Sequence, residues 1–387
     1  MQCVRQLRQH LVGLRQISSQ GNFFKELPII DIAPLIAPNS TLGERAKVGN
    51  ELHEACKRVG FFYIRNGMAE AIARTVRTQA RQWFALPEAT KREILLRPES
   101  HYRGYQPLGV NVTQNQRDWH EGIDLYKEIS PGQAALLPPS PIHGINPLLT
   151  HIPSFRNALE LYISSCLGLG AALMRGIALG LHLPENAFEG ERAGDPYWVT
   201  RVIHYPPLPS LMNTPSISTT SKDPSLSSKT NTSSSYASGS VTDDTVESVV
   251  SCGAHTDYGL LTIVNQDDDL DLTALQVRNG KGEWIDAPPL PGTFVCNIGD
   301  MLRIWTNGMY RPTLHRVVHR HPTKSRISIP FFYEPNFEAI VKPFPELVAM
   351  SREEEIIPGV RYGSHLEAKV LNNFKLDGAN QGLTAGG

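Results

Sequence analysis

Three side chains, His255, Asp257 and His315, constrain the fold most strongly, because their chemistry requires them to meet although the third lies far along the chain. Successive residues of a β-strand point to opposite faces, so a His-x-Asp pair on one strand directs both side chains to the same side. A distant strand can then supply the third ligand. Two imidazoles and one carboxylate on one face of an octahedral ion leave positions open for other ligands. The pattern therefore favours a β-rich C-terminal half that holds a catalytic metal ion.

A His-x-Asp pair alone would be weak support, since the chain has 13 histidines and such pairs arise by chance. A second pattern follows it. Arg326 and Ser328 form an Arg-Ile-Ser step, and strand alternation again places both side chains on one face. Arginine can bind a carboxylate through two parallel hydrogen bonds, and a nearby hydroxyl can add a third. Together the two patterns predict a small acid that chelates the metal at one end and is anchored at the other.

At these residues the chain resembles the 2-oxoglutarate and Fe(II)-dependent dioxygenases of the isopenicillin N synthase-like superfamily. The resemblance lies in four C-terminal stretches, residues 254–262 (AHTDYGLLT), 292–300 (GTFVCNIGD), 313–318 (TLHRVV) and 326–331 (RISIPF). It extends upstream, in the same order as in the family, to residues 27–31 (LPIID), 60–63 (GFFY), 84–87 (FALP) and 118–121 (DWHE). It therefore covers most of the chain from about residue 27 to residue 374.

The resemblance implies roles for individual residues. His255, Asp257 and His315 match the iron ligands of the family. The far carboxylate of 2-oxoglutarate is expected to bind to the matching set of Arg326, Ser328 and Tyr205. The expected walls of the substrate pocket are Tyr102, Tyr105, Asn111 and Phe332. One departure is Ile203, which stands two positions before Tyr205 where many members have asparagine.

By the same resemblance, the expected cofactors are Fe(II), 2-oxoglutarate as co-substrate and O2, with ascorbate as a candidate reductant. The expected reaction couples oxidative decarboxylation of 2-oxoglutarate to succinate with hydroxylation, or alternatively desaturation or ring closure, of a small organic metabolite. Two alternatives remain open. One is a cupin-like metal-dependent enzyme that does not use 2-oxoglutarate, although it would not need Arg326 and Ser328. The other is a catalytically silent binding protein of the same fold.

The expected fold is a mainly β core, a double-stranded β-helix or jelly roll, flanked by N-terminal helices and a long backing helix. Residues 1–25 form an N-terminal extension and residues 26–150 an α/β region. Residues 151–345 comprise the backing helix, at about 153–183, and the jelly-roll core, which a Ser/Thr-rich insertion interrupts at 210–248. That insertion is too polar to offset its ordering entropy, so we expect it to be disordered. Residues 346–387 are expected to form a C-terminal helix and a flexible tail.

Composition narrows the class of protein further. Lys and Arg number 37 against 38 Asp and Glu, which argues against a nucleic-acid partner. The five cysteines are scattered without a Cys-x-x-Cys pair, so neither a disulfide framework nor a zinc ribbon is indicated. We expect a monomer in the cytoplasm without membrane contact. The N-terminal segment has arginines and no acidic residue before Glu26, which suits either a mitochondrial or plastid transit peptide or an ordinary N-terminal helix.

Overall fold

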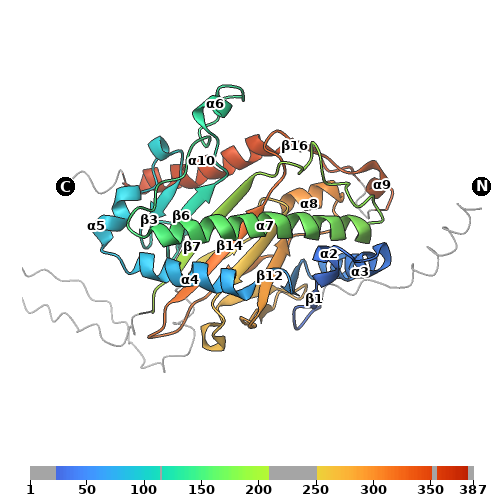
Figure 1. The fold of residues 1–387 in the computed structure, drawn as a ribbon, viewed down its shortest axis with the longest axis horizontal. Coiled ribbons are helices and arrows are strands. Elements are labelled where there is room, and N and C mark those ends of the chain that lie inside the picture. Colours follow the sequence, from blue (N-terminus) through green and yellow to red (C-terminus); the bar gives the residue numbers. More distant parts are fainter. Residues whose placement is uncertain (1–22, 114–115, 209–250, 351–354, 382–387) are drawn as a thin grey trace, which may run out of the picture.

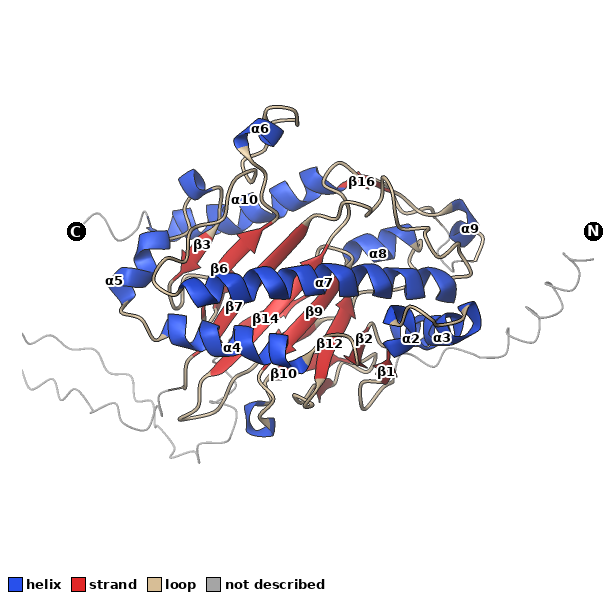
Figure 2. Ribbon diagram, viewed as in Figure 1, coloured by secondary structure: helices blue, strands red, loops and turns tan. Residues whose placement is uncertain are grey.

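The computed structural model describes residues 23–113, 116–208, 251–350 and 355–381. The N-terminal extension and the Ser/Thr-rich insertion predicted from the sequence therefore lie almost wholly outside the described residues. Between the described segments, helices cover one face of a large sheet, and a smaller sheet lies on its other side (Figure 1; Figure 2).

The N-terminal region alternates helices with short strands. Its elements are β1 (Ile29–Asp31), α2 (Ala33–Ile36), α3 (Leu42–Arg58), β2 (Phe61–Arg65), α4 (Glu70–Phe84), α5 (Glu88–Lys91), β3 (Gly104–Gln106), β4 (Val112–Thr113), β5 (Gln116–Arg117), β6 (Glu121–Tyr126) and α6 (Pro131–Ala134). Helix α3 begins where it does because Thr41 and Glu44 form a reciprocal capping box that satisfies the first free backbone N–H groups.

The remaining elements build the core. They are α7 (Pro153–Gly180), β7 (Trp198–Tyr205), β8 (Cys252–His255), β9 (Leu261–Gln266), β10 (Leu275–Arg278), β11 (Trp284–Asp286), β12 (Thr293–Ile298), α8 (Asp300–Trp305), β13 (His315–Val317), β14 (Arg326–Tyr333), β15 (Ile340–Val341), α9 (Pro345–Val348), β16 (Val360–Arg361) and α10 (Tyr362–Gln381).

Two sheets form the double-stranded β-helix predicted from the sequence. The large sheet has the strand order β1-β2-β12-β9-β14-β7-β6-β3, and the small sheet has the order β11-β10-β13-β8. Tyr205 and Val295 of the large sheet share a buried apolar cluster with Val277 and Val317 of the small sheet. The inner faces of the two sheets therefore enclose the interior of the jelly roll.

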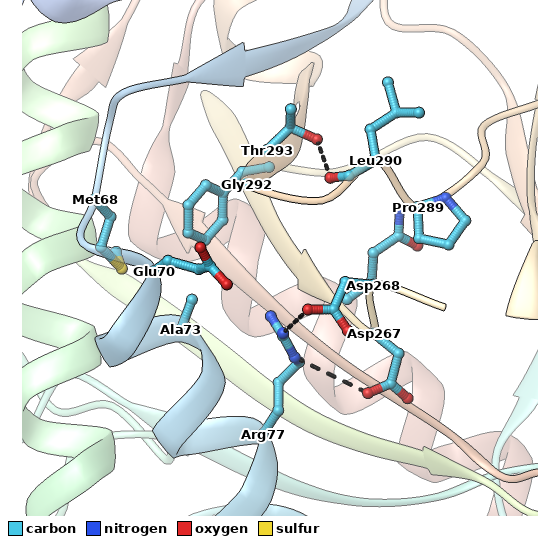
Figure 3. Close-up of a pocket in the computed structure, with 12 residues that line it drawn as sticks. Met68, Glu70, Ala73, Arg77, Asp267, Asp268, Pro289, Leu290, Gly292 and Thr293 are labelled. Atoms are coloured by element: carbon cyan, nitrogen blue, oxygen red, sulfur yellow. Dashed lines mark hydrogen bonds and ion pairs between the residues drawn. The ribbon is translucent and has the colours of Figure 1, made fainter. Parts of the chain in front are cut away.

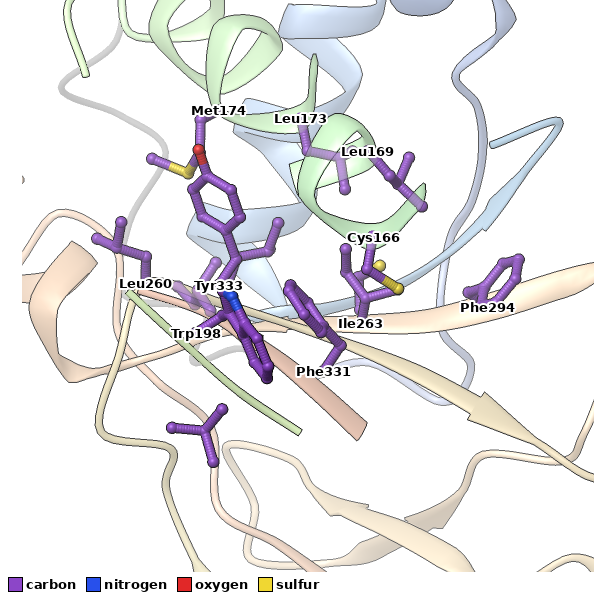
Figure 4. Close-up of a cluster of buried hydrophobic side chains, with 14 of the residues drawn as sticks. Cys166, Leu169, Leu173, Met174, Trp198, Leu260, Ile263, Phe294, Phe331 and Tyr333 are labelled. Atoms are coloured by element: carbon purple, nitrogen blue, oxygen red, sulfur yellow. The ribbon is translucent and has the colours of Figure 1, made fainter. Parts of the chain in front are cut away.

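Strand β14 shows how the two faces of the large sheet differ. Ile329, Phe331 and Tyr333 point outward towards α7, and the Tyr162 hydroxyl of α7 donates to the carbonyl of Ile329 at 2.8 Å. Figure 4 shows Phe331 and Tyr333 facing the α7 side chains Leu169, Leu173 and Met174. The alternate residues, which include Arg326 and Ser328, point inward because strand side chains alternate. The outer face is thus hydrophobic core, and the inner face is available for chemistry.

Helix α7 is the predicted backing helix, and it ends at Gly180 rather than at Leu183. His182, which follows it, has a left-handed backbone with φ of 58°, and this conformation ends the helical path. By length and composition alone α7 could cross a membrane, but 56% of its most apolar window is buried inside the protein. That burial is the pattern of a core helix.

Candidate metal and co-substrate site

The three predicted metal ligands converge. His255 ends β8 and His315 begins β13, and the two residues are direct partners in the antiparallel pairing of these strands. Asp257 lies just beyond the end of β8, not on the strand as the sequence predicted. Its Oδ1 is 3.7 Å from Nε2 of His255 and 3.6 Å from Nε2 of His315. One ligand atom from each residue lies within 4.8 Å of the others, which is close enough for a single ion.

Hydrogen bonds to the remaining polar atoms of the ligands fix their orientation. Nδ1 of His255 donates to the carbonyl of Gly253 at 2.7 Å, so Nε2 is the nitrogen left to bind a metal ion. Nδ1 of His315 contacts the carbonyl of Thr313 in the same way, at 3.2 Å. Such contacts from outside the ligand shell set the tautomer and the ring orientation.

The second oxygen of Asp257 is also held. Oδ2 accepts hydrogen bonds from Asn297 Nδ2, at 2.6 Å, and from the hydroxyl of Thr262. Burial by itself raises the pKa of the Asp257 carboxyl, but the two imidazoles and these two donors together hold that pKa below its ordinary value. The carboxylate is therefore anionic and has Oδ1 free for a cation, and the donor set fits Fe(II).

Arg326, Ser328 and Tyr205 lie together on the inner face of the large sheet. Arg326 is the direct strand partner of Tyr205, its Cζ is 5.0 Å from the centre of that ring, and Ser328 is two residues farther along β14. Arg326 is 1% exposed, and its Nη2 donates to Oε1 of Gln266 at 2.7 Å. Its Nη1 is buried with no hydrogen-bond partner among the described residues. A buried donor without a partner is costly, and a ligand carboxylate would satisfy it.

The four predicted pocket residues do not gather in one place. Phe332 faces inward beside Thr262, its strand partner and a support of Asp257. Asn111 contacts His120 and Arg201 on the inner side of the barrel. Tyr105 does not join them.

Tyr105 lies on the outer face of the large sheet. Its ring packs edge-on against Trp83, and its hydroxyl donates to Glu88 and Glu121. Its neighbours on β3, Gly104 and Gln106, take the inner face because side chains alternate along the strand. Tyr102 is partly buried and packs against the larger hydrophobic cluster, as Phe332 also does. The expectation that Tyr105 lines the pocket is thus not supported by its position, whereas that for Tyr102 stays a prediction.

Several supporting residues were not predicted as part of the site. Asn297 and Thr262 stand in the stretches that carried the family resemblance, but nothing local marks them as partners of Asp257. In the 118–121 stretch, Asp118 accepts a hydrogen bond from the backbone N–H of Gly253, which fastens this loop to β8. His319 is buried and contacts the carbonyl of Lys324 at 2.9 Å, so its role is structural.

A separate crevice of about 30 Å³ lies on the outer side of the molecule, between α4 and the β9 end of the large sheet (Figure 3). Arg77 crosses it and pairs with Asp268 at 2.9 Å, and Oδ1 of Asn265 accepts from the same guanidinium. None of the three metal ligands lines it. A volume of this size holds about one water molecule, so the crevice is a packing feature and not the substrate cavity.

This fold, with an open two-histidine, one-carboxylate centre at its core, defines a mononuclear non-haem iron oxygenase. Comparison with known proteins narrows the class. The model of the 2OG-Fe(II) oxygenase superfamily matches residues 231–335, and that of the non-haem dioxygenase in morphine synthesis N-terminal region matches residues 27–148.

Similar proteins agree with this assignment. Homoarginine-6-hydroxylase 2-ODD-233 of Oryza sativa subsp. japonica is 43% identical over 364 residues, which cover 92% of this chain and 99% of the rice protein. Homoarginine-6-hydroxylase 2-ODD-C23.1 of Arabidopsis thaliana is 40% identical over 369 residues, covering 91% and 99%. The crystal structure of the dioxygenase for auxin oxidation in rice has the same fold, with a TM-score of 0.61, 22% identity and coverage of 90% and 96%.

The chain belongs to the 2OG-Fe(II) oxygenase superfamily. It is an Fe(II)- and 2-oxoglutarate-dependent dioxygenase, with the iron at His255, Asp257 and His315.

Proposed function

We propose that the enzyme hydroxylates C6 of homoarginine. The observation that carries the proposal is that four relatives with this activity in their names are 38–43% identical to the chain over 91–94% of its length. At such identity over nearly whole chains, the frame of the cavity is shared. Homoarginine is also a small, highly polar molecule, and the inner face of this barrel carries the charged side chains of Arg201 and Asp124, which suit a charged substrate better than a purely apolar one.

The co-substrate assignment belongs to the same proposal. Arg326, with Nη1 buried and unpartnered among the described residues, would bind the far carboxylate of 2-oxoglutarate, assisted by Ser328 and Tyr205. When bound, Fe(II) and 2-oxoglutarate supply the oxidising power: 2-oxoglutarate, O2 and the substrate C–H bond become succinate, CO2 and a C–OH group. Gln266 holds the other amino group of Arg326 and so keeps the guanidinium plane fixed towards the cavity.

The direct test is turnover of homoarginine by the purified enzyme supplied with Fe(II), ascorbate and 2-oxoglutarate. C6 bears the guanidine nitrogen, and a hydroxyl on such a carbon is a hemiaminal that can collapse to guanidine and an aldehyde. Product is therefore measured by mass spectrometry both as the intact adduct and as guanidine.

We expect one succinate for each homoarginine consumed, and no product from an Asp257→Ala variant. If the wild-type protein binds iron and 2-oxoglutarate but homoarginine neither stimulates succinate formation nor is consumed, the proposed function is wrong.

A further inference from the structure

An ion pair between Arg201 and Asp124 lies on the inner face of the large sheet, apart from the metal ligands. Nε of Arg201, on β7, donates to Oδ1 of Asp124, on β6, at 2.7 Å. Gln106, on β3, donates to the other carboxylate oxygen of Asp124 at 2.6 Å. The side chains of Arg201 and Asp124 are 24% and 11% exposed, so the pair is largely enclosed but still reaches open space.

Strand register places this pair on the same face as Arg326. Tyr205 is opposite Arg326, Ile203 is opposite Ser328, and Arg201 follows two residues farther along the same strand. Residues that differ by an even number on one strand share a face. Four residue steps, about 13 Å along the strand, separate Tyr205 from Arg201, so the pair lies beyond the proposed 2-oxoglutarate-binding residues on the same face of the sheet.

A chain of hydrogen bonds through Asn111 and His120 orients the Arg201 guanidinium. His120 is fully buried, and burial lowers its pKa to about 3, with the positive charge of Arg201 as a further cause. The neutral ring donates from Nδ1 to the carbonyl of Ser251 at 2.7 Å, so its Nε2 accepts from Asn111 Nδ2 at 3.2 Å. This orientation turns Oδ1 of Asn111 towards Nη2 of Arg201, at 3.5 Å.

Two groups of the pair remain available to a ligand. Nη1 of Arg201 makes no hydrogen bond to a described residue, and a carboxylate such as Asp124 can accept more hydrogen bonds than the two it receives here. A buried ion pair is a poor source of stability, because desolvation offsets most of its attraction. A pair that is partly exposed and keeps unused hydrogen-bonding positions is therefore better explained by what it binds.

We propose that Arg201 and Asp124 bind the α-amino-acid end of the substrate, with the substrate carboxylate on Arg201 and its ammonium group on Asp124. The inference rests on the proposed function and names the residues that determine its specificity. Only this end of homoarginine carries both charges. The guanidinium end of homoarginine would be repelled by Arg201 and is therefore directed away from it. C6, which bears the guanidinium, then also points away from Arg201.

Substrate analogues test the proposal on the wild-type enzyme, without any mutation. (5-Aminopentyl)guanidine is homoarginine without its carboxylate, and 6-guanidinohexanoate is homoarginine without its α-ammonium group. We expect each to raise KM at least about 30-fold relative to homoarginine, because each leaves one member of the pair unmatched. The visible band of the anaerobic Fe(II)–2-oxoglutarate complex gives a second readout, since bound substrate perturbs it, and the analogues should do so only at correspondingly higher concentrations.

An Arg201→Gln variant supplies the decisive comparison. We expect it to raise KM for homoarginine at least about 30-fold and to change KM for (5-aminopentyl)guanidine less than about 3-fold, because that analogue has no carboxylate to lose. The control is Arg77→Gln, which removes a largely buried arginine that pairs with two aspartates on the outer side of the sheet. The control should leave both values unchanged.

The outcomes separate the two claims. If the wild-type enzyme does not turn over homoarginine, the proposed function fails and this inference fails with it. If homoarginine is turned over but the wild-type enzyme accepts both analogues equally well, Arg201 and Asp124 are only structural. The same conclusion follows if the Arg201→Gln variant, shown to be folded by thermal unfolding, has KM raised equally for homoarginine and for the analogue without a carboxylate.

Discussion

Arg326 shows how much a single buried residue can control. Its guanidinium is enclosed, one amino group is held by Gln266 and the other has no described partner. We expect Arg326→Gln to raise KM for 2-oxoglutarate at least about 30-fold, because a charge-assisted pair with the far carboxylate is lost. Iron affinity should change little, since none of the three metal ligands is altered.

Anaerobic titration separates the two effects. Fe(II) binding is measured first, and the charge-transfer band is then followed as 2-oxoglutarate is added. A variant that loses iron in the first step, or one that keeps the wild-type 2-oxoglutarate affinity in the second, would contradict the role given to Arg326.

Residues whose roles depend on strand alternation could be predicted from the sequence. His255 and the Arg326–Ser328 step follow from it. Asp257 still lies beside His255, although it is past the end of the strand. Partners joined only by sheet order could not, because Asn297 and Asp257 meet across 40 positions of sequence. Tyr105 illustrates the same limit, since alternation separates it from Gln106 but does not say which of the two faces is inside.

At the scale of elements, the contact between α3 and α7 depends on glycine. A Cβ added to Gly180 would lie 2.2 Å from the carbonyl oxygen of Gly49, and one added to Gly49 would lie 2.7 Å from that of Gly176. Both obstacles are backbone, which cannot rotate away. The two helices can therefore approach this closely only without side chains at these positions.

Gly180→Ala should accordingly lower the free energy of unfolding by about 1–3 kcal/mol, as expected for overpacking a tight contact. Gly168→Ala in the same helix is the matched control, because its Cβ would meet nothing within 4 Å. Alanine there should instead stabilise the protein by up to about 1 kcal/mol through helix propensity. Urea unfolding of both variants measures the two values, and equal effects would show that the glycine contact does not matter.

The helices themselves were accessible to sequence analysis, but their partners were not. The backing helix was predicted at about 153–183, and the structure confirms it as α7, which ends at Gly180. The choice of α3 as a partner of α7 depends on small residues more than 100 positions apart, Gly49 and Gly176. No local pattern links them, so this packing emerges only in three dimensions.

At the scale of the whole molecule, closure of the barrel buries the carboxyl group of Glu334. Glu334, at the end of β14, has 3% of its surface exposed and packs against Gly259, two residues after the ligand Asp257. Burial raises the pKa of Glu334 to about 8, and the nearby Asp257 and Asp300 carboxylates act in the same direction. In the unfolded chain the pKa returns to 4.5.

The sign of the resulting pH dependence is determined by these two values. Between them the folded protein holds a proton that the unfolded chain has released, so stability falls as pH rises through this window. The contribution of Glu334 to the free energy of unfolding is therefore complete below pH 4.5 and is lost once pH passes about 8. The buried His120 and His319, with pKa values of about 3 and about 4, act at the acid end, below their unfolded value of 6.5.

Glu334→Gln isolates this effect, because the amide has nearly the same shape and cannot ionise. In metal-free protein, where no cation offsets the charge of Asp257, we expect wild type and variant to have similar unfolding free energies at pH 5. The variant should then become more stable than wild type by a few kcal/mol at pH 9, since only the wild type must place a charge in the core. Urea unfolding at intervals between these pH values measures the divergence. Parallel curves would show that water reaches Glu334 and that the barrel is less tightly closed behind the metal ligands than its packing indicates.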